Sequence, residues 1–204
     1  RAGDIAERYG ATFLTMHRAD LLNMLVAALP DTLFHTDAEC VSVEQRDNGA
    51  VAIFADGKSV EADVIIGADG IHSVVRDSLF GETAPRFTGC ICWRGLVPGD
   101  ALPDPAFARQ MIAWWGPHGH IVHYPVRREG ELVNFVAHYD SEEWTEESWT
   151  HECDRSELME TYARWNPDLL GLIQSSEKYY KWALYDRDPL EKWTIGRVTL
   201  LGDS

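Results

Sequence analysis

The chain has 204 residues, of which 45% are apolar and 25% are charged, and its formal net charge is −15. These proportions are ordinary for a globular protein and argue against a disordered chain, a collagen-like repeat and a disulfide scaffold. The acidic balance argues against nucleic-acid binding and against a basic membrane anchor, because both need a cationic surface. The length allows one large domain or two small ones.

The negative charge is concentrated between residues 140 and 157. Eight acidic residues lie there beside one arginine, which gives this segment a net charge of −7. We interpret the segment as a solvated part of the surface. A docking site for a basic partner protein is the alternative.

The ends of the sequence suggest a segment of a longer protein, because it begins with Arg1 rather than Met and ends just after an apolar run. No signal peptide is recognisable, and the longest apolar runs are far too short to span a bilayer. The four cysteines contain no CxxC pair, which favours free thiols in a reducing compartment. We therefore expect a cytoplasmic location.

The first part of the chain predicts a helix followed by a small antiparallel sheet. Apolar residues recur with helical spacing over residues 17–29, and Pro30 ends the predicted helix. Short alternating runs, separated by Asp-Asn-Gly and Asp-Gly turns, then predict a meander of strands. These strands are expected at residues 33–35, 40–44 and 51–54.

A strand, a turn and a helix are predicted next. Residues 62–66 form a continuous apolar strand, Gly-Ala-Asp-Gly at 67–70 forms the turn, and residues 71–80 have helical character. Glycines in such a turn let a backbone approach a ligand closely, and the following helix N-terminus favours anionic groups such as phosphates. The sequence therefore indicates a candidate ligand-binding turn.

From about residue 85 the sequence is rich in aromatic strands. The expected strands lie at residues 90–97, 109–115, 120–126 and 132–139. Residues 155–175 then predict two helices separated at Asn166-Pro167. Strands at 179–184 and 197–201 follow, and Asp203 comes directly after the second of them. Such an aspartate can accept a hydrogen bond from a sugar hydroxyl or can cap the next helix.

Five motifs, taken in order, resemble those of the single-component FAD-dependent aromatic hydroxylases. This family includes salicylate, 3-hydroxybenzoate 6- and 6-hydroxynicotinate 3-monooxygenases. The motifs are His-Arg-Ala-Asp-Leu at 17–21, Gly-Ala-Asp-Gly-Ile-His-Ser-Val-Val-Arg at 67–76, Trp-Arg-Gly at 93–95, His-Ile-Val-His-Tyr-Pro at 120–125 and Gly-Arg-Val-Thr-Leu-Leu-Gly-Asp at 196–203. The resemblance extends over nearly the whole chain.

The resemblance implies an α/β (mixed α+β) fold, in which part of a Rossmann-like FAD domain joins a substrate domain with a large mixed β-sheet. Residues 1–84 and 191–204 would belong to the FAD domain, and residues 85–190 to the substrate domain. The sequence lacks the GxGxxG unit with which the family begins and the proline- and glycine-rich loop that follows Gly-Asp. We therefore expect the activity to belong to a longer parent protein and this segment alone to be inactive.

The resemblance also implies how FAD would be held. The residues expected to bind the cofactor are Arg18, Cys40, Asp69, Gly70, Gly202 and Asp203. Arg18 would contact the flavin, and the backbone at Cys40 would meet the adenosine part. Asp69 and Gly70 would serve both FAD and the nicotinamide donor, NADH or NADPH. Asp203 would hold the ribityl chain near the pyrophosphate.

A strand at residues 120–126 carries the residues that the resemblance implies are catalytic. His120 and Tyr124 share one strand face, with their Cα atoms roughly 13 Å apart. A phenol with a pKa near 10 needs a base that titrates near neutrality, which would be His120, while Tyr124 would hydrogen-bond to the phenol. A zinc site at His118, His120 and His123 is the alternative, although alternation places His123 on the opposite face. We expect no metal.

Cys90, Cys92 and Arg94 share one face of the strand expected at 90–97, where we expect them either to line the substrate cavity or simply to pack. Arg94 could pair with a substrate carboxylate.

The predicted function is FAD- and NAD(P)H-dependent hydroxylation of a small phenolic aromatic acid with O2, and a homodimer is compatible with it. Hydroxylation of 3-hydroxybenzoate or 6-hydroxynicotinate is favoured over that of salicylate. The alternatives are a non-catalytic β-rich binding fragment, or a flavin reductase or epoxidase of the same fold that acts on a non-phenolic substrate.

Overall fold

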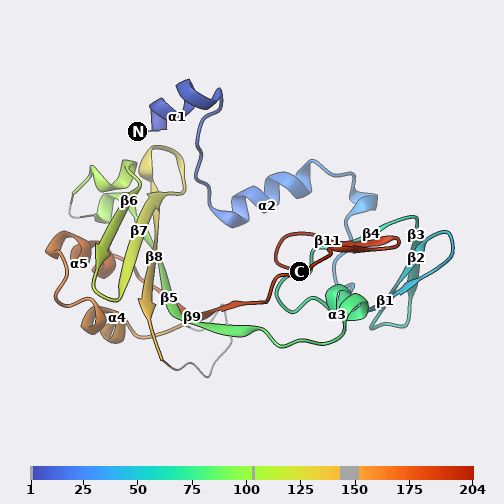
Figure 1. Ribbon diagram of the computed structural model, residues 1–204. Coiled ribbons are helices and arrows are strands. Elements are labelled where there is room, and N and C mark those ends of the chain that lie inside the picture. Colours follow the sequence, from blue (N-terminus) through green and yellow to red (C-terminus); the bar gives the residue numbers. More distant parts are fainter. Residues whose placement is uncertain (1, 103, 143–151) are drawn as a thin grey trace. The chain divides into compact units, whose positions relative to one another are not determined.

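The computed structural model describes residues 2–102, 104–142 and 152–204, and for residues 2–4 only the backbone. The chain divides into two compact units, which are described separately. The first unit comprises residues 1–28 and 89–184, and the second comprises residues 29–88 and 185–204 (Figure 1). The predicted mixed α/β class is confirmed. The predicted domain boundaries at residues 84 and 190 stay a prediction.

A five-stranded sheet with the order β6-β7-β8-β5-β9 forms the centre of the first unit. Its strands are β5 (Arg86–Pro98), β6 (Ile112–Gly116), β7 (Gly119–Pro125), β8 (Leu132–Asp140) and β9 (Tyr179–Asp186). Strands β6, β7, β8 and β5 pair in antiparallel fashion. The aromatic-rich strands predicted from the sequence are therefore confirmed. Three 3-10 turns lie in the connections: η2 (Gly99–Ala101), η3 (Phe107–Arg109) and η4 (Arg128–Gly130).

Helices α4 (Arg155–Thr161) and α5 (Pro167–Gln174) cover one face of this sheet (Figure 1). Their starts are fixed by side-chain caps, because Asp154 accepts from the Ser156 amide at 2.6 Å and Asn166 from the Asp168 amide at 2.8 Å. The helices bury four aliphatic side chains completely: Leu158, Leu169, Leu172 and Ile173. Tyr162 follows α4 and packs edge-on against Trp93 at 6.2 Å, which joins this core to β5.

The opposite face of the sheet carries no such helix pair among the described residues, and we call it the open face. Side chains alternate along each strand, so the register of the strand pairs decides which residues share this face. The pairing places Cys92 opposite His138, His138 opposite His120, and Asn134 opposite Tyr124.

Two further helices precede the sheet in the first unit: α1 (Ala2–Tyr9) and α2 (Arg18–Ala27). The predicted helix at 17–29 is thus confirmed, yet none of the residues of α2 is buried in the described chain. The start of α2 is held at the end of β7, where the His17 amide donates to the Val126 carbonyl at 3.0 Å. The Asp20 carboxylate and the Arg127 guanidinium lie 3.3 Å apart.

The second unit contains two three-stranded sheets and one helix. Strands β1 (Cys40–Gln45), β2 (Ala50–Phe54) and β3 (Ser59–Ala62) form an antiparallel meander, in which β1 and β2 match predicted strands and β3 was not predicted. In the other sheet, β10 (Thr194–Ile195) pairs with β11 (Val198–Leu200), and β11 runs parallel to β4 (Ile65–Gly67). The strand predicted at 33–35 is wrong: η1 (Asp31–Leu33) is a 3-10 turn, in which the Leu33 amide donates to the Pro30 carbonyl.

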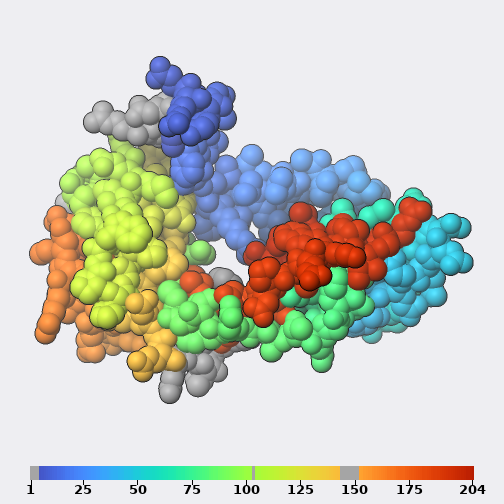
Figure 2. Space-filling view, viewed as in Figure 1, coloured from blue at the N-terminus to red at the C-terminus, as the bar shows by residue number. Residues whose placement is uncertain are grey.

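The core of the second unit joins segments far apart in the sequence. Helix α3 (Val74–Phe80) contributes Val75, which packs in one cluster with Val43, Ala50, Val198 and Leu200. Figure 2 shows the result at the surface, where the C-terminal residues (red) lie on the segment that contains α3 (green). The C-terminal strand is therefore an integral part of this unit.

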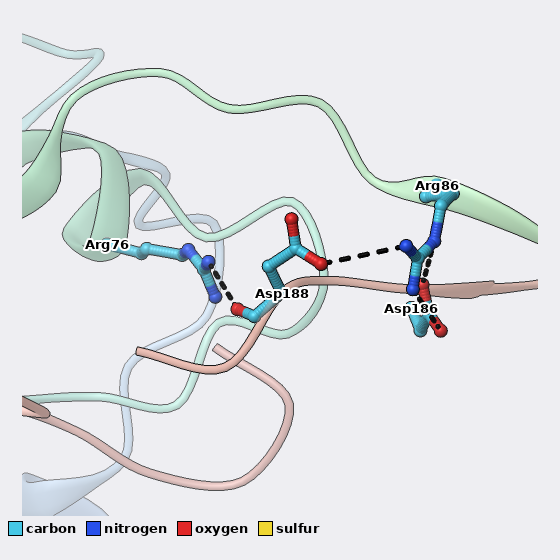
Figure 3. Close-up of polar contacts among 4 residues, drawn as sticks. All are labelled: Arg76, Arg86, Asp186 and Asp188. Atoms are coloured by element: carbon cyan, nitrogen blue, oxygen red, sulfur yellow. Dashed lines mark hydrogen bonds and ion pairs between the residues drawn. The ribbon is translucent and has the colours of Figure 1, made fainter. Parts of the chain in front are cut away.

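Ion pairs join β5 and β9 where both strands lie in the second unit (Figure 3). The Arg86 guanidinium donates to both carboxylate oxygens of Asp186, at 3.1 and 3.2 Å, and lies 3.7 Å from the Asp188 carboxylate. The buried Arg76 donates to the Asp188 backbone carbonyl at 3.5 Å. Because Arg86 and the two carboxylates are exposed, this network orders the strand ends and adds little stability.

The acidic segment at 140–157 lies only partly in the described chain, since residues 143–151 are outside it. Its five described acids are all exposed, as expected of a solvated surface: Asp140, Glu142, Glu152, Asp154 and Glu157. Glu152 pairs with Lys178 and Glu157 with Lys181, while the Asp140 carboxylate lies 3.8 Å from His118 Nδ1. Among the described residues, no helix combines the length and apolar character that a membrane crossing requires.

Truncation of Leu172 to alanine is expected to lower the free energy of unfolding by about 2–4 kcal/mol, because this fully buried side chain would leave a cavity between α5 and the sheet. Urea denaturation followed by circular dichroism measures the loss. The exposed Gln174→Ala variant on the same helix is the control and should differ from wild type by less than about 0.5 kcal/mol. Equal stability of the two variants would contradict the assigned core.

Candidate functional site

The open face of the first unit carries a row of four side chains that crosses four strands. The Cys92 Sγ lies 2.9 Å from His138 Nδ1, and the His138 ring stacks on the His120 ring with a centroid distance of 4.4 Å and an angle of 10°. His120 stacks in turn on Trp115 at 5.0 Å. The row therefore runs from β5 through β8 and β7 to β6 and fixes the orientation of His120.

Further polar residues share this face. Arg94 is exposed, and its guanidinium lies 5.3 Å from the ring of Trp182 in a cation–π contact. Tyr124 is half-buried and lies directly opposite Asn134. Asn134 is only 5% exposed, and its side-chain Nδ2 has no hydrogen-bond partner within the described part of the chain. The face thus combines an imidazole, a phenol, an amide and a guanidinium.

The Cys92 thiol and the His138 imidazole of this row are electrically neutral at neutral pH. Burial raises the pKa of the Cys92 thiol well above its usual range, and the neighbouring Cys90 raises it further. Burial also lowers the pKa of His138, with a smaller contribution from the nearby His120. Neither group therefore places a charge beside His120.

His123 lies on the other face of β7, apart from His120. It is fully buried, and its Nδ1 accepts from Trp114 Nε1 at 3.0 Å. Burial lowers the pKa of His123 to about 4, so that it is a neutral core histidine at pH 7. His118 is exposed in the turn before β7. The alternative of one zinc site at His118, His120 and His123 is therefore not supported.

In the second unit, the Gly-Ala-Asp-Gly turn is organised by the carboxylate of Asp69. Its Oδ1 accepts from Ser73 Oγ at 2.5 Å, and its Oδ2 accepts from the Val75 amide at 3.1 Å. Ser73 is itself the N-cap of α3 and accepts from the Arg76 amide at 2.9 Å. Burial raises the pKa of Asp69, but hydrogen bonds from Ser73, Val75 and Ser204 outweigh it and hold the pKa below its ordinary value.

Parallel pairing of β4 with β11 brings the two predicted cofactor motifs together. Gly67 lies opposite Leu200, so the turn at 67–70 and the residues after β11 leave the same edge of the sheet. The Gly70 amide donates to Ser204 Oγ at 3.1 Å across 134 residues of sequence. The carboxyl ends of adjacent parallel strands are where α/β folds bind ligands.

The glycines of these motifs leave the backbone accessible. Gly70 and Gly202 have φ angles of 79° and 70°, in the left-handed region that favours glycine. A Cβ atom at either position would meet no other atom within 4 Å. Asp203 is exposed beside them. Accessible amides with an adjacent carboxylate fit the pyrophosphate and hydroxyl groups of a dinucleotide.

The two remaining predicted cofactor residues lie in different units. Cys40 begins β1 in the second unit, and its thiol donates to the Ser42 carbonyl at 3.5 Å. Burial raises the pKa of Cys40, and the negative charge of Asp69 adds to this, so Cys40 is neutral near the turn. Arg18 is the exposed first residue of α2 in the first unit.

A pocket of about 580 Å³ adjoins the start of α2. It lies between the segment before α2 and the end of β7, and its lining includes Phe13, Met16, Asp20, Met24, Arg127 and Arg128. Sequence reasoning did not identify this pocket.

Sequence reasoning also missed His138 and Asn134. Both lie on β8, where alternation places them on one face, but only the register of β8 against β7 shows that this face is the one with His120 and Tyr124. Ser73 and Ser204 were missed because their role depends on contacts with Asp69 and Gly70.

Replacement of Asp69 by asparagine should lower the free energy of unfolding at pH 7 by about 1 kcal/mol, because the turn loses a charged hydrogen-bond acceptor. The loss of free energy is no larger because Asp69 is exposed and water screens its charge. The folded-state pKa lies below the unfolded value of about 3.9, so this contribution is complete above about pH 4 and is lost as pH falls through the folded-state pKa. Urea titrations at several pH values should show that the difference in free energy of unfolding between the variant and wild type becomes smaller as the pH falls. The exposed Asp63→Asn variant is the control, and a difference that persisted unchanged at pH 2 would contradict this role.

The chain matches the family described as FAD binding domain over residues 5–204. The 3-amino-4-hydroxybenzoate 2-monooxygenase PtnB3 of Streptomyces platensis is 43% identical over 198 residues, which cover 97% of this chain and 50% of that relative. The 6-hydroxynicotinate 3-monooxygenase of Pseudomonas fluorescens is 35% identical over 208 residues, with 99% and 53% covered. The chain spans about half the length of the curated relatives it matches.

Solved structures are also similar to this chain over about half of their own length. The structure of a salicylate hydroxylase substrate complex has a TM-score of 0.78 at 30% identity, over 92% of this chain and 50% of that one. Klebsiella pneumoniae HpxO complexed with FAD and uric acid has a TM-score of 0.84 at 26% identity, over 99% of this chain and 51% of that one. With a family match over residues 5–204 and curated relatives above 40% identity, the chain belongs to the FAD binding domain family.

Proposed function

We propose that the protein carrying this chain hydroxylates a small phenolic aromatic acid, using FAD, a nicotinamide donor and O2. The observation that carries the proposal is the open face of β7, where His120 and Tyr124 lie on one side of the strand and His120 is oriented by two stacked rings. The relatives are named as hydroxylases of 3-amino-4-hydroxybenzoate, 6-hydroxynicotinate and 3-hydroxybenzoate, which are all hydroxylated aromatic acids.

His120 is the proposed base. A neutral imidazole can take the proton of a phenol once the two are held within hydrogen-bonding distance. The resulting phenolate donates electron density to the ring and makes its ortho and para carbons more nucleophilic. The neutral His138 behind His120 adds no charge that would oppose the proton transfer.

Tyr124 and Arg94 are the proposed substrate-positioning residues. The Tyr124 hydroxyl can donate a hydrogen bond to the phenolate oxygen, which stabilises the charge that deprotonation creates. The exposed Arg94 guanidinium can pair with the substrate carboxylate in a bidentate geometry. Cys90 and Cys92 lie beside Arg94 on the same strand face and would line the aromatic ring of the substrate.

The turn in the second unit is the proposed FAD site, and FAD supplies the electron transfer and the activation of O2. The residues that would hold it are Asp69, Gly70, Gly202 and Asp203, with Cys40 and Arg18 as further contacts. The amides near Gly70 would bind phosphate oxygens, while Asp203 would accept hydrogen bonds from hydroxyl groups. NADH or NADPH would be the co-substrate, and we place the protein in the cytoplasm as a homodimer.

The His120→Gln variant of the full-length protein is expected to lose about 10²–10⁴-fold in kcat at pH 7, because the phenol then has no base. Activity should recover as the pH approaches the phenol pKa near 10, where the substrate ionises without help. Product formation from 3-hydroxybenzoate and 6-hydroxynicotinate, measured against pH, tests this expectation.

The control for this experiment is His118→Asn. His118 is exposed in a turn with a φ of 60°, which asparagine tolerates, and it should keep wild-type kcat. Wild-type kcat in His120→Gln would overturn the proposed base and favour an enzyme that acts on a non-phenolic substrate. If no hydroxylated benzoate or pyridine stimulated nicotinamide oxidation or gave a hydroxylated product with the wild-type protein, the hydroxylase proposal itself would be overturned.

The Asp203→Ala variant is expected to weaken FAD binding by about 10–100-fold, the effect of losing hydrogen bonds to a charged acceptor. Flavin fluorescence titration of the full-length apoprotein measures the dissociation constant. Asp63→Asn, an exposed aspartate in the loop before β4, serves as control. Unchanged FAD affinity with lowered stability would show that Asp203 is a helix cap rather than a cofactor ligand.

A further inference from the structure

Three side chains on the open face, two of which would also line the proposed substrate, form a cluster of potential metal ligands. Cys90, Cys92 and His138 present three ligand atoms that all lie within 4.8 Å of one another. Cys90 and Cys92 project from the same face of β5, and His138 comes from the neighbouring β8, directly opposite Cys92. Two antiparallel strands therefore hold the three side chains in place, so little conformational entropy remains to be lost when they converge.

We propose that Cys90, Cys92 and His138 form a binding site for a soft divalent metal ion, with Zn²⁺ as the best-matched example. Two thiolates and an imidazole are the ligands that zinc prefers, and hard ions such as Mg²⁺ and Ca²⁺ disfavour them. The inference concerns a site separate from FAD, and it does not depend on the proposed hydroxylation.

The spacing of the ligand atoms suits a tetrahedral ion. Bonds of about 2.3 Å to sulfur and about 2.0 Å to nitrogen place the ligand atoms of a tetrahedron roughly 3.5–3.8 Å apart. In the cluster the three ligand atoms lie within 4.8 Å of one another, and the 2.9 Å contact of Cys92 Sγ with His138 Nδ1 is shorter than a tetrahedron requires. A small outward rotation of the His138 ring gives the required distance. The thiol–imidazole contact also shows that the two groups already face each other.

The charge of the cluster also favours a divalent metal ion. Cys92 is fully buried, while Cys90 and His138 are half-buried, so a pair of free thiolates would be costly at this position. A divalent ion with two thiolates and a neutral imidazole has no net charge, which removes most of that cost. A divalent ion can therefore replace the protons that the two thiols carry when no ion is bound.

A disulfide fits the geometry less well. Cys90 and Cys92 are two residues apart on a regular strand, which separates their Cα atoms by about 6.6–6.8 Å. This is the upper end of the range that disulfides span, roughly 4.4–6.8 Å. Both cysteines are free in the structure. Bridging them would require the strand to deform, whereas binding a metal would not.

The fourth coordination position would be open. His120 stacks on His138 with nearly parallel rings, so it presents its ring face, rather than a ring nitrogen, toward His138. His120 therefore stays outside the ligand set, and a water molecule or a small anion completes the tetrahedron.

Cobalt is the probe that tests the site, because tetrahedral Co²⁺ with thiolate ligands absorbs visible light at wavelengths beyond those of oxidised flavin. The reduced full-length protein should bind one Co²⁺ per chain with this absorption and release it when Zn²⁺ is added. His138→Gln and Cys90→Ser should each weaken binding by at least about 100-fold, since the loss of even an outer-shell partner costs about 10–100-fold.

Cys153→Ser is the matched control, because Cys153 is a half-buried free cysteine outside the cluster, and it should bind cobalt like wild type. Far-UV circular dichroism confirms that each variant is folded, and the two half-buried positions avoid the packing risk of changing Cys92. Absence of the tetrahedral cobalt band in wild type would overturn the site. A band of wild-type strength in both His138→Gln and Cys90→Ser would overturn it equally. The readout is spectral, so a failure of the hydroxylase proposal would leave it unaffected.

Discussion

The antiparallel register of β5, β8 and β7 is the constraint on which the chemistry of the first unit depends. It aligns Cys92, His138 and His120 in one row across three strands. A shift of one residue in either pairing would turn His120 toward the helices and bring the buried Ile121 or His123 to the open face. The register is itself fixed by burial, because Trp93, Phe135 and Ile121 must all lie on the face that α4 and α5 cover.

The second unit depends on a different pairing. Strands β4 and β11 are 130 residues apart in the sequence, yet they run parallel and end at the same edge of their sheet. Asp69 and Asp203 are both exposed at this edge, and Asp69 uses both carboxylate oxygens to hold its own turn. Asp69 therefore has a structural role in its own turn in addition to its proposed contact with FAD.

The polar groups on the open face differ in burial and in charge. Burial keeps Cys92 and His138 neutral, whereas the guanidinium of Arg94 is exposed on the same face. A neutral interior beside an exposed cation suits a flat aromatic ring with an acidic substituent, which is the substrate class of the proposed function.

The sequence by itself determined the local elements and the identity of the motifs. Turn chemistry, apolar periodicity and the break at Asn166-Pro167 predicted most of the strands and helices. The strand predicted at 33–35 is instead a 3-10 turn that follows Pro30, and the short elements α1, β3 and β10 were not predicted. The motifs around Asp69, His120 and Asp203 indicated the family before any geometry was known. Only the tertiary structure decided which motifs meet, because the register of β8 against β7 and β5 and the parallel pairing of β4 with β11 depend on burial between separate segments of the chain. For that reason His138, Asn134 and Ser204 became visible only once the sheets had formed.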